Sequence, residues 1–537
     1  MKPLLTSNLK IKFLGITPVL KDETGVLSPQ EIVVLSSYAT FKGKSIKNLL
    51  QEIKKSGENL KDRVKKTLMK SSLRGHASLS TTPVISLSYE GSKFLDSALT
   101  GIYFSSSLVS SGRRTETTEK DIVFPSSIFF NKKARKIYRD SSEKTIKFFN
   151  FLLSQKIQKD ETSKILQYGI YGTGIIQLPI ETIIGLKREF EAEKDWMPEE
   201  VGILLNKIEK EAKKLGIDWL YATREAAPRN VYPYPNIFKD LRKTNLTREL
   251  RENLPFKKGA NLISMDILVS NELKRKLTEL EKKTKKTFSS LKIIKRDWMC
   301  LLALRQEILR DYNSALRFKV LSTIPWRVWG EKKRHRTCPQ IIESIYYCIE
   351  RAGQKFKKFS QKIKNKQINK KITEEIEETF SIPPSIKQNK DLLFQYLSTA
   401  LQAFESYNKL INLGIKPKEA IFLIPRAVKI DILQEYDLYN LLTGYYPLRL
   451  CQTAEEEMRR NTLREIALVK ENFTKKGLGF LNKFMVPKCG IVGFCPEEKS
   501  CPMILSAVKN YNEKFHQEMK AELKRLFEKN LKNLGSR

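Results

Sequence analysis

The chain has 537 residues with 41% hydrophobic content, and its 98 Lys and Arg outnumber 60 Asp and Glu to give a net charge of +38. That length exceeds what one hydrophobic core usually serves, so we expect two or more domains, and the 9% aromatic content argues against a disordered chain. No run of 18 apolar residues occurs, which argues against a membrane span, and the N-terminus lacks the apolar stretch of a secretory signal.

The excess of basic residues favours polyanionic partners such as nucleic acid or phosphorylated metabolites. The alternative is a diffuse basic surface that follows from a Lys-, Ile- and Asn-rich composition, because the Lys residues are spread through the whole chain. Seven cysteines, an odd number, fit a reducing cytoplasm better than a disulfide framework. We therefore expect a cytoplasmic protein.

The N-terminal part gives helix and strand signals in alternation. Residues 49–69 carry Leu, Ile and Val at helical spacing among Lys and Glu. Residues 84–91 alternate apolar and small polar side chains and end in Gly, which predicts a strand, and residues 92–108 have helical character. Further on, residues 169–179 hold three glycines and predict a turn-rich strand, and a helix is expected to begin near Met197.

A short polar turn follows the predicted 92–108 helix. Ser111, Gly112 and Arg113 combine a hydroxyl, a glycine that permits close backbone approach and a forked cation, which suits a phosphate. The alternative is a helix C-cap at Gly112 with an arginine near the last carbonyls.

The middle of the chain is rich in proline and charge. Residues 228–235 are proline-dense and indicate a domain edge, and residues 240–290 are charged and helical. Residues 353–372 form a Lys-rich insertion, which predicts a solvated loop or, alternatively, a contact with a polyanion.

The second half contains a compact cationic motif. A strand-like and Trp-bearing stretch, residues 317–329, leads to Arg334, His335 and Arg336, and Ser344 follows after seven more residues. Two guanidiniums beside an imidazole suit a diphosphate or a heterocycle that gains negative charge. In a chain this rich in Lys and Arg, a chance cluster on a solvated face is the alternative.

The spacing Arg-His-Arg, seven residues, Ser resembles the signature of the flavin-dependent thymidylate synthase family. In the first half, the order Gly-His-x-Ser78, strand, helix and Ser-Gly-Arg resembles the same family, but Gly-Ile-Tyr at 101–103 stands in the Arg-His-Arg place. The second half keeps Arg-His-Arg, whereas Ile and Tyr at 345–346 replace the Gly and Arg that follow the family's serine. The two halves thus resemble complementary partial copies.

Later segments extend this resemblance. Residues 407–425 are similar to the family's Glu-Ala-Arg…Leu-Pro segment, with Ile421 in the arginine place, and Lys164 takes that place in the first half. Within residues 447–459, Arg449 falls on the family's substrate arginine. Three positions that contact the flavin in the family differ here: Asp437, Tyr439 and Thr453.

The C-terminal segment resembles a cysteine-bearing tail found in many family members. Five residues separate Cys489 from Cys495, and five separate Cys495 from Cys501. Metal sites usually use tighter pairs, so we predict no metal site, although His516 could be a fourth ligand.

The resemblance implies an α+β fold of two tandem domains, each a mixed sheet with packed helices. The expected boundaries are an N-terminal domain at 1–235, a charged helical linker at 236–290 and a C-terminal domain at 291–537. We expect a fused pseudo-dimer with one composite site, and further self-association of the chain.

The resemblance also implies a reaction and a set of roles. The family methylates dUMP to dTMP with methylenetetrahydrofolate and NADPH as co-substrates and FAD as cofactor, and no protein cysteine attacks the uracil. The implied FAD contacts are Arg334, His335, Arg336 and Ser78. The implied dUMP contacts are Ser111, Gly112, Arg113 and Arg449, and the implied catalytic residues are Arg449 and Ser344.

An alternative function stays open at this point. The departures at Ile421, Tyr346 and Thr453, together with the net charge of +38, fit a catalytically inactive relative. Such a protein would bind nucleotide or nucleic acid through a basic surface.

Overall fold

The computed structural model describes most of the chain: residues 3–22, 25–111, 116–228, 235–243, 245–254, 259–268, 270–287, 305–508 and 511–535. The predictions for Gly112 and Arg113 and for residues 229–234 of the proline-dense segment lie outside these residues. The chain forms two compact units. Unit 1 comprises residues 1–244, 325–336 and 343–430, and unit 2 comprises residues 245–324, 337–342 and 431–537.

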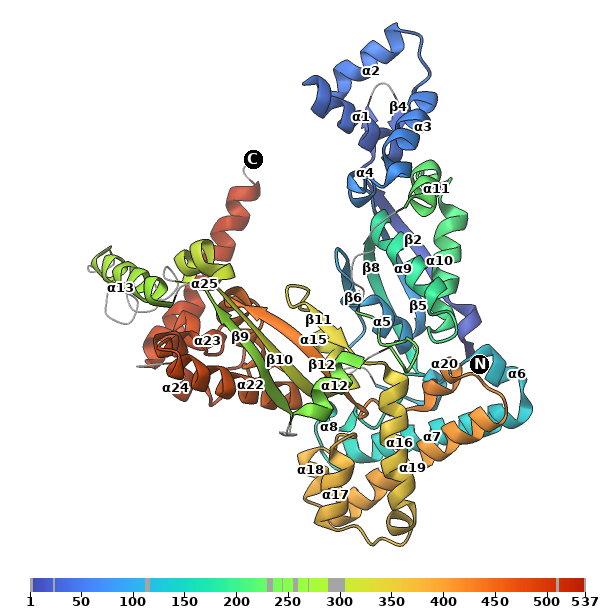
Figure 1. The fold of residues 1–537 in the computed structure, drawn as a ribbon, viewed down its shortest axis with the longest axis vertical. Coiled ribbons are helices and arrows are strands. Elements are labelled where there is room, and N and C mark those ends of the chain that lie inside the picture. The colour runs from blue at the N-terminus through green and yellow to red at the C-terminus, as the bar shows by residue number, and fades with distance from the viewer. Residues whose placement is uncertain are drawn as a thin grey trace. The chain divides into compact units, whose positions relative to one another are not determined.

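Unit 1 is built on a four-stranded sheet with the order β2-β5-β8-β6 (Figure 1). Its strands are β2 (Lys10–Thr17), β5 (Val84–Ser92), β6 (Ser106–Val109) and β8 (Tyr171–Pro179), and the neighbouring pairs are antiparallel. Side chains alternate along β5, so Ile85, Leu87 and Tyr89 are buried on one face. The predicted strands at 84–91 and 169–179 are confirmed.

The predicted helix at 92–108 is wrong in its second half. Helix α5 (Lys93–Leu99) ends just before Gly101, whose φ of 86° lies in the left-handed region, and strand β6 follows.

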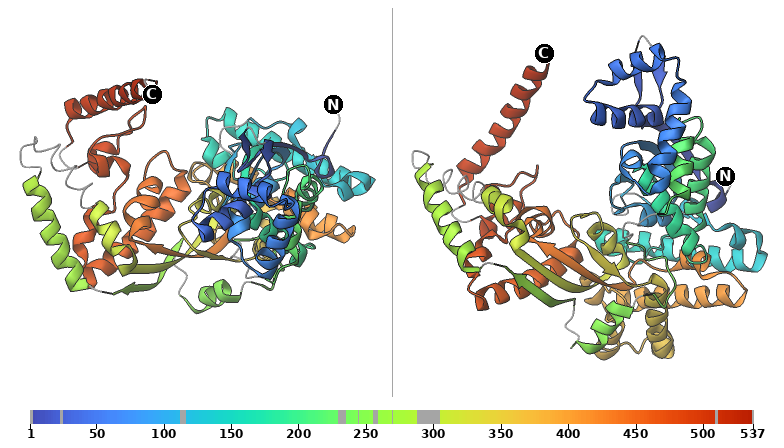
Figure 2. Two further views of the ribbon diagram at one scale, coloured as in Figure 1. Left: turned by 90° about the horizontal axis from the view of Figure 1, so that it is seen from above. Right: turned by 45° about the horizontal axis from the view of Figure 1, so that its top comes forward.

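Helices cover the sheet of unit 1 and continue beyond it. Figure 2 shows the N-terminal helices α1, α2 and α3 as a group at one end of the unit. Long helices α7 and α19 pack side by side although they come from different halves of the chain (Figure 1). The helices of five or more residues are α1 (Pro29–Lys42), α2 (Ile46–Lys55), α3 (Leu60–Lys70), α5, α6 (Ser126–Phe130), α7 (Lys132–Ser154), α9 (Ile180–Ala192), α10 (Glu199–Glu211), α11 (Asp218–Ala226), α15 (Trp326–Lys332), α16 (Ile345–Lys364), α17 (Lys370–Glu377) and α19 (Lys390–Asn412).

Shorter elements complete unit 1. They are strands β1 (Leu4–Leu5), β3 (Leu20–Asp22), β4 (Gly25–Leu27) and β7 (Val123–Phe124), and helices α4 (Ser78–Thr81), α8 (Lys159–Thr162), α18 (Pro384–Lys387) and α20 (Pro417–Ala420).

The Lys-rich insertion at 353–372 is not a loop along most of its length. Residues up to Lys364 belong to α16, because Phe356, Phe359 and Ile363 recur at helical spacing and are buried. The apolar face of α16 packs on α19, and its lysines lie on the opposite face.

Unit 2 holds a second four-stranded sheet with the order β9-β10-β12-β11. Its elements are strands β9 (Ala260–Ile267), β10 (Leu316–Pro325), β11 (Gln340–Ile342) and β12 (Lys429–Asp437), and helices α12 (Asn245–Asn253), α13 (Ser270–Thr287), α21 (Tyr446–Arg449), α22 (Glu456–Lys475), α23 (Lys488–Val492), α24 (Ile504–Ala507) and α25 (Glu513–Gly535). A core that includes Phe318, Tyr436 and Phe473 joins this sheet to α22. Strand β9 lies within residues 236–290, where we expected a helical linker.

The two sheets share one topology. In each, the first and second strands in chain order are neighbours, the fourth comes next and the third lies at the edge. In each, a short helix follows the second strand: α5 follows β5, and α15 follows β10. Within the described residues, no helix is long and apolar enough to cross a membrane.

Candidate functional site

A cationic cavity lies in unit 1, where elements from both halves of the chain meet. It spans about 430 Å³ of empty space and opens to solvent. Of the described residues that line it, five are basic and only Asp96 is acidic. The basic residues are Lys93, Arg327, Lys333, Arg334 and Arg426. Such an excess of positive charge around a partly enclosed space favours an anionic ligand.

Helix α5 places the first charges. The Ser92 hydroxyl caps the helix by accepting a hydrogen bond from Phe94 N at 3.2 Å, so Lys93 stands in the first turn. Its ammonium lies 2.9 Å from Asp96 Oδ2 and also donates to the carbonyl and hydroxyl of Ser110. Burial lowers the pKa of Lys93, and the Asp96 carboxylate opposes this effect. The contact joins the start of α5 to the residue after β6.

Helix α15 and the residue after it supply the opposite wall. Arg327 is 7% exposed and donates to Glu331 Oε1 at 3.3 Å, one turn later. Lys333 is buried, lies 4.3 Å from the Trp329 ring centroid and donates to Ser97 O. Burial, with a smaller effect of Arg334, holds the pKa of Lys333 well below its usual range. These cations are held in place by the protein before any ligand arrives.

Arg426 is the most deeply buried arginine of the cavity. It is 1% exposed, donates from Nε to Gln167 O at 3.1 Å and places its guanidinium 4.7 Å from the Tyr168 ring centroid. Its Nη2 has no hydrogen-bond partner among the described residues. Burial lowers the pKa of Arg426 to about 10. A buried guanidinium with an unused donor gains most from a bound anion.

The structure brings part of the predicted motif to this cavity. Arg334 lines it, whereas Arg336 is half-buried and donates from Nε to Ile102 O at 3.0 Å. His335 is half-buried beside them. From the first half, Ser110 lines the cavity, so the predicted Ser111 turn begins at its edge.

Residues 101–103, which align with Arg-His-Arg in the predicted resemblance, begin with Gly101 and Ile102, and these two pack against Lys333 and Arg336. A Cβ atom on Gly101 would lie 2.7 Å from Lys333 O, and Arg336 bonds to the carbonyl of the next residue, Ile102. Residues 101–102 and 333–336 are therefore in direct contact within unit 1. Glycine is required at 101 both for its positive φ and for this close approach.

Three other predicted site residues lie elsewhere. Ser78 is exposed in the first turn of α4. Ser344 is buried at the N-cap of α16, where its hydroxyl accepts from Tyr346 N at 3.2 Å and donates to Lys239 O at 2.7 Å. This placement favours a structural role over the predicted catalytic one. Arg449 is the last residue of α21 in unit 2.

The sequence reading missed Lys93, Arg327 and Arg426. An acidic residue three positions after Lys93 in the first turn of a helix was an available signal, because i and i+3 side chains share a face. Arg327 and Arg426 each follow a proline at a strand or helix boundary by one or two residues, a local pattern without chemical meaning by itself.

Part of the second half of the chain is similar to known proteins. Residues 315–473 match the family model described as thymidylate synthase complementing protein. Flavin-dependent thymidylate synthase of Pyrococcus furiosus is 32% identical over 133 residues, which cover 24% of this chain and 52% of that protein. The Pyrococcus horikoshii enzyme of the same name is 35% identical over 137 residues with the same coverage. The chain spans about half the length of the curated relatives it matches.

Solved structures were also compared. The UMP/dUMP methylase PolB from Streptomyces cacaoi, bound with 5-Br dUMP, aligns over 42% of this chain and 100% of its own, with 12% identity and a TM-score of 0.31. ThyX from Helicobacter pylori, complexed with FAD and dUMP, aligns over 42% and 99%, with 13% identity and a TM-score of 0.26. These values are too low to carry an argument. The match of residues 315–473 and the curated relatives support the resemblance predicted from Arg-His-Arg: this part of the chain is similar to flavin-dependent thymidylate synthases.

Proposed function

We propose that this chain is a flavin-dependent thymidylate synthase that converts dUMP to dTMP, with methylenetetrahydrofolate and NADPH as co-substrates. The observation that carries the proposal is the cationic cavity, where Arg334 of the Arg-His-Arg motif lies with the buried, incompletely bonded Arg426. Both dUMP and FAD present phosphate oxygens, which are strong acceptors for guanidinium donors. The family's curated relatives support the same reaction.

The donor set fits a nucleotide phosphate or diphosphate. Arg334, Arg327 and Arg426 supply forked donors, which suit phosphate oxygens. When bound, FAD supplies the hydride that the methylation requires. The protein's part is to orient the anionic groups and to stabilise charge that develops during reaction, for which one preorganised donor typically contributes about 3 kcal/mol.

We further propose that the chain arose by tandem duplication and works as a pseudo-dimer. The identical strand order of the two sheets supports this, as does the packing of Gly101 against Lys333. Within unit 1, Ser110 from the first half and Arg334 from the second line one cavity, which supports a composite site. The roles of Ser78, Gly112, Arg113 and Arg449 stay predictions, and so do the boundaries near 235 and 290.

The test uses the full-length chain. Purified protein is reconstituted with FAD, and bound flavin and dTMP formed from dUMP, methylenetetrahydrofolate and NADPH are measured. R334A should lower dTMP formation about 100-fold, as for loss of one preorganised donor. R310A is the matched control, because Arg310 is an exposed arginine in unit 2 paired with Glu307. Absence of both flavin and dTMP in the unmodified chain would overturn the proposal.

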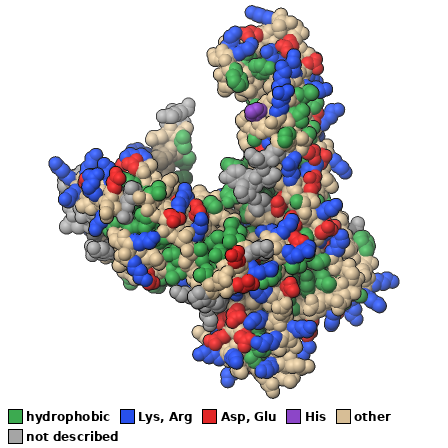
Figure 3. Space-filling view, viewed as in Figure 1, with side chains coloured by type: hydrophobic (Ala, Val, Ile, Leu, Met, Phe, Trp, Pro, Cys, Tyr) green, Lys and Arg blue, Asp and Glu red, His purple; other side chains and the backbone are tan. Residues whose placement is uncertain are grey.

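A second candidate is binding of nucleic acid without catalysis. Ile421, in the family's arginine place, is fully buried and cannot reach a substrate. A surface hollow at α3 is lined by four basic residues and one acidic residue: Lys65, Lys66, Lys70, Arg74 and Asp62. On the face in Figure 3, however, basic side chains are spread over the surface and mixed with acidic ones. Binding that weakens steeply with salt and survives R334A would favour this candidate.

A further inference from the structure

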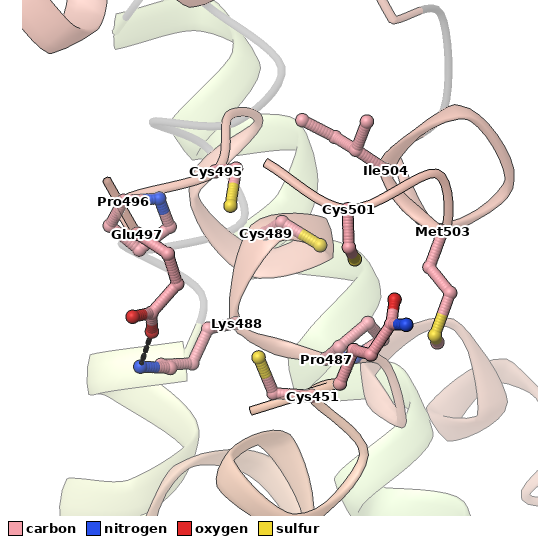
Figure 4. Close-up of a pocket in the computed structure, with 11 residues that line it drawn as sticks. Cys451, Pro487, Lys488, Cys489, Cys495, Pro496, Glu497, Cys501, Met503 and Ile504 are labelled. Carbon is pink, nitrogen blue, oxygen red and sulfur yellow. Dashed lines mark hydrogen bonds and ion pairs between the residues drawn. The ribbon is translucent and has the colours of Figure 1, made fainter. Parts of the chain in front are cut away.

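Four of the chain's seven cysteines line one small cavity in unit 2. Cys451 lies in the loop after α21, Cys489 lies in α23, and Cys495 and Cys501 lie in the loop that follows α23. Figure 4 shows their sulfur atoms around a shared interior, with Met503 at its side. Cys451 thus places its sulfur at the same cavity as Cys489, although the two residues are 38 positions apart in the sequence.

The cavity is apolar and its thiols are close enough to influence one another. Cys489 and Cys495 are 8% and 6% exposed and pack with Ile504. Burial raises the pKa of Cys489 to about 11, and the neighbouring Cys495, Cys451 and Cys501 raise it further. Four thiolates could share this space only with a compensating cationic centre, because buried like charges disfavour one another.

The loop that carries two of these cysteines is fixed by contacts that do not use sulfur. Buried His516 accepts a hydrogen bond from Cys495 N at 3.2 Å through Nδ1, and its Nε2 lies 3.0 Å from Ser500 Oγ. Lys488 pairs with Glu497 at 2.6 Å. Both ring nitrogens of His516 are therefore engaged, so we do not count it among the ligands. Cys451 is the fourth side chain instead.

The arrangement distinguishes between kinds of metal centre. A single tetrahedral ion needs all its sulfur ligands about 2.3 Å from one point. Among the described residues, no group of three or more His, Cys, Asp and Glu side chains is arranged to hold a metal ion. In an iron–sulfur cluster the four cysteines ligate two or more irons around an inorganic core, so their sulfurs stand farther apart. The four thiols line one apolar space that no described side chain fills.

We propose that Cys451, Cys489, Cys495 and Cys501 bind an iron–sulfur cluster. The apolar lining shields the cluster from water, and no other acidic or imidazole ligand is needed, because Glu497 and His516 have partners of their own. The cluster is structural: it ties the C-terminal segment to the loop after α21. The proposal does not rest on thymidylate synthesis, because iron and sulfide are measured without turnover.

The test begins with the full-length chain purified without oxygen and reconstituted with ferrous iron and sulfide. Iron, acid-labile sulfide and zinc are then counted per chain, and the dithionite-reduced protein is examined by electron paramagnetic resonance. We expect iron and sulfide in equal amounts, about two or four of each. An iron–sulfur signal is distinct from that of any flavin radical. Zinc without sulfide, or no metal at all, overturns the proposal.

Variants locate the cluster. C489S and C495S should each lose most of the iron and sulfide, whereas C348S should keep both, because Cys348 is a buried cysteine in α16 of unit 1. If the cavity variants do not fold, chelation of iron from the unmodified chain replaces them and should lower its melting temperature by several degrees. Iron that persists in soluble C489S and C495S, or a melting temperature unchanged by chelation, contradicts the proposal.

Discussion

Replacing Arg426 with methionine should weaken anion binding without a matching loss of stability. Burial lowers the pKa of this guanidinium from 12.5 to about 10, and each pKa unit corresponds to about 1.36 kcal/mol. The charge, which is present at pH 7, therefore costs the free protein about 3 kcal/mol. The variant removes this cost, but it also loses the bond to Gln167 and the contact with Tyr168, worth about 1 kcal/mol each.

These opposing changes nearly cancel in the ligand-free protein. We expect the free energy of unfolding of R426M to differ from that of the unmodified chain by about 1 kcal/mol, in either direction. A hydrogen bond from a charged donor contributes about 1.5–3 kcal/mol. Affinity for dUMP, and for inorganic phosphate as a simpler probe, should therefore fall about 10- to 100-fold.

Isothermal titration calorimetry at fixed ionic strength measures the affinity, and chemical denaturation measures the stability. The control is R305M, because Arg305 in unit 2 is also buried with its pKa lowered to about 10, but it donates to Phe484 O away from the cavity. R305M should leave anion affinity unchanged. Unchanged affinity in R426M, or an equal loss in R305M, would refute the assignment of Arg426 to an anion site.

Three further outcomes are expected. Burial raises the pKa of Glu200 to about 7, so the folded state holds a proton that the unfolded state loses near pH 4.5. The unfolding free energy should therefore fall by about 3 kcal/mol between pH 4.5 and 7.5. The variant E200Q, measured by denaturation across this range, should abolish that fall. G101A should lower the melting temperature and weaken dUMP binding, because its Cβ would meet Lys333 O at 2.7 Å. In contrast G185A, at a glycine inside α9 with open space around it, should leave binding unchanged and should not lower the melting temperature. S344A should lower the unfolding free energy by about 1 kcal/mol through loss of the α16 cap while flavin content stays constant, and a fall in flavin content would contradict the structural role.

The sequence predicts much of the local structure and the similarity that the comparisons support. Regular alternation marks the strand around Leu87. The Arg-His-Arg spacing leads to the resemblance that the comparisons support, and to one wall of the cavity through Arg334. Prediction from the sequence fails where a single residue changes the direction of the chain. The helical pattern continues past Gly101, but the positive φ of this glycine is incompatible with a continued helix. Prediction from the sequence also treats lysine runs as solvated, although Phe356 and Ile363 hold α16 in the core.

The buried cations could not be read from local pattern. In a chain of this composition, Lys93 and Arg426 look like surface residues. Only tertiary contacts bury them and bring both to the same cavity. The same holds for Cys451, which lies 38 positions before Cys489 and meets it only after the C-terminal segment has folded back. Long-range placement, and not residue type, turns these side chains into sites.

Unit 1 is built from three separate stretches of the chain, which limits where the protein could be cut without loss of this unit. Residues 325–336 and 343–430 complete a compact body begun by residues 1–244. A protein cut near the middle would leave the amino-terminal fragment without α15 and Arg426, and the carboxy-terminal fragment without the α5 wall of the cavity. Two such fragments, expressed separately, would regain the cavity only by reassociating, whereas a single chain supplies both parts in equal amounts.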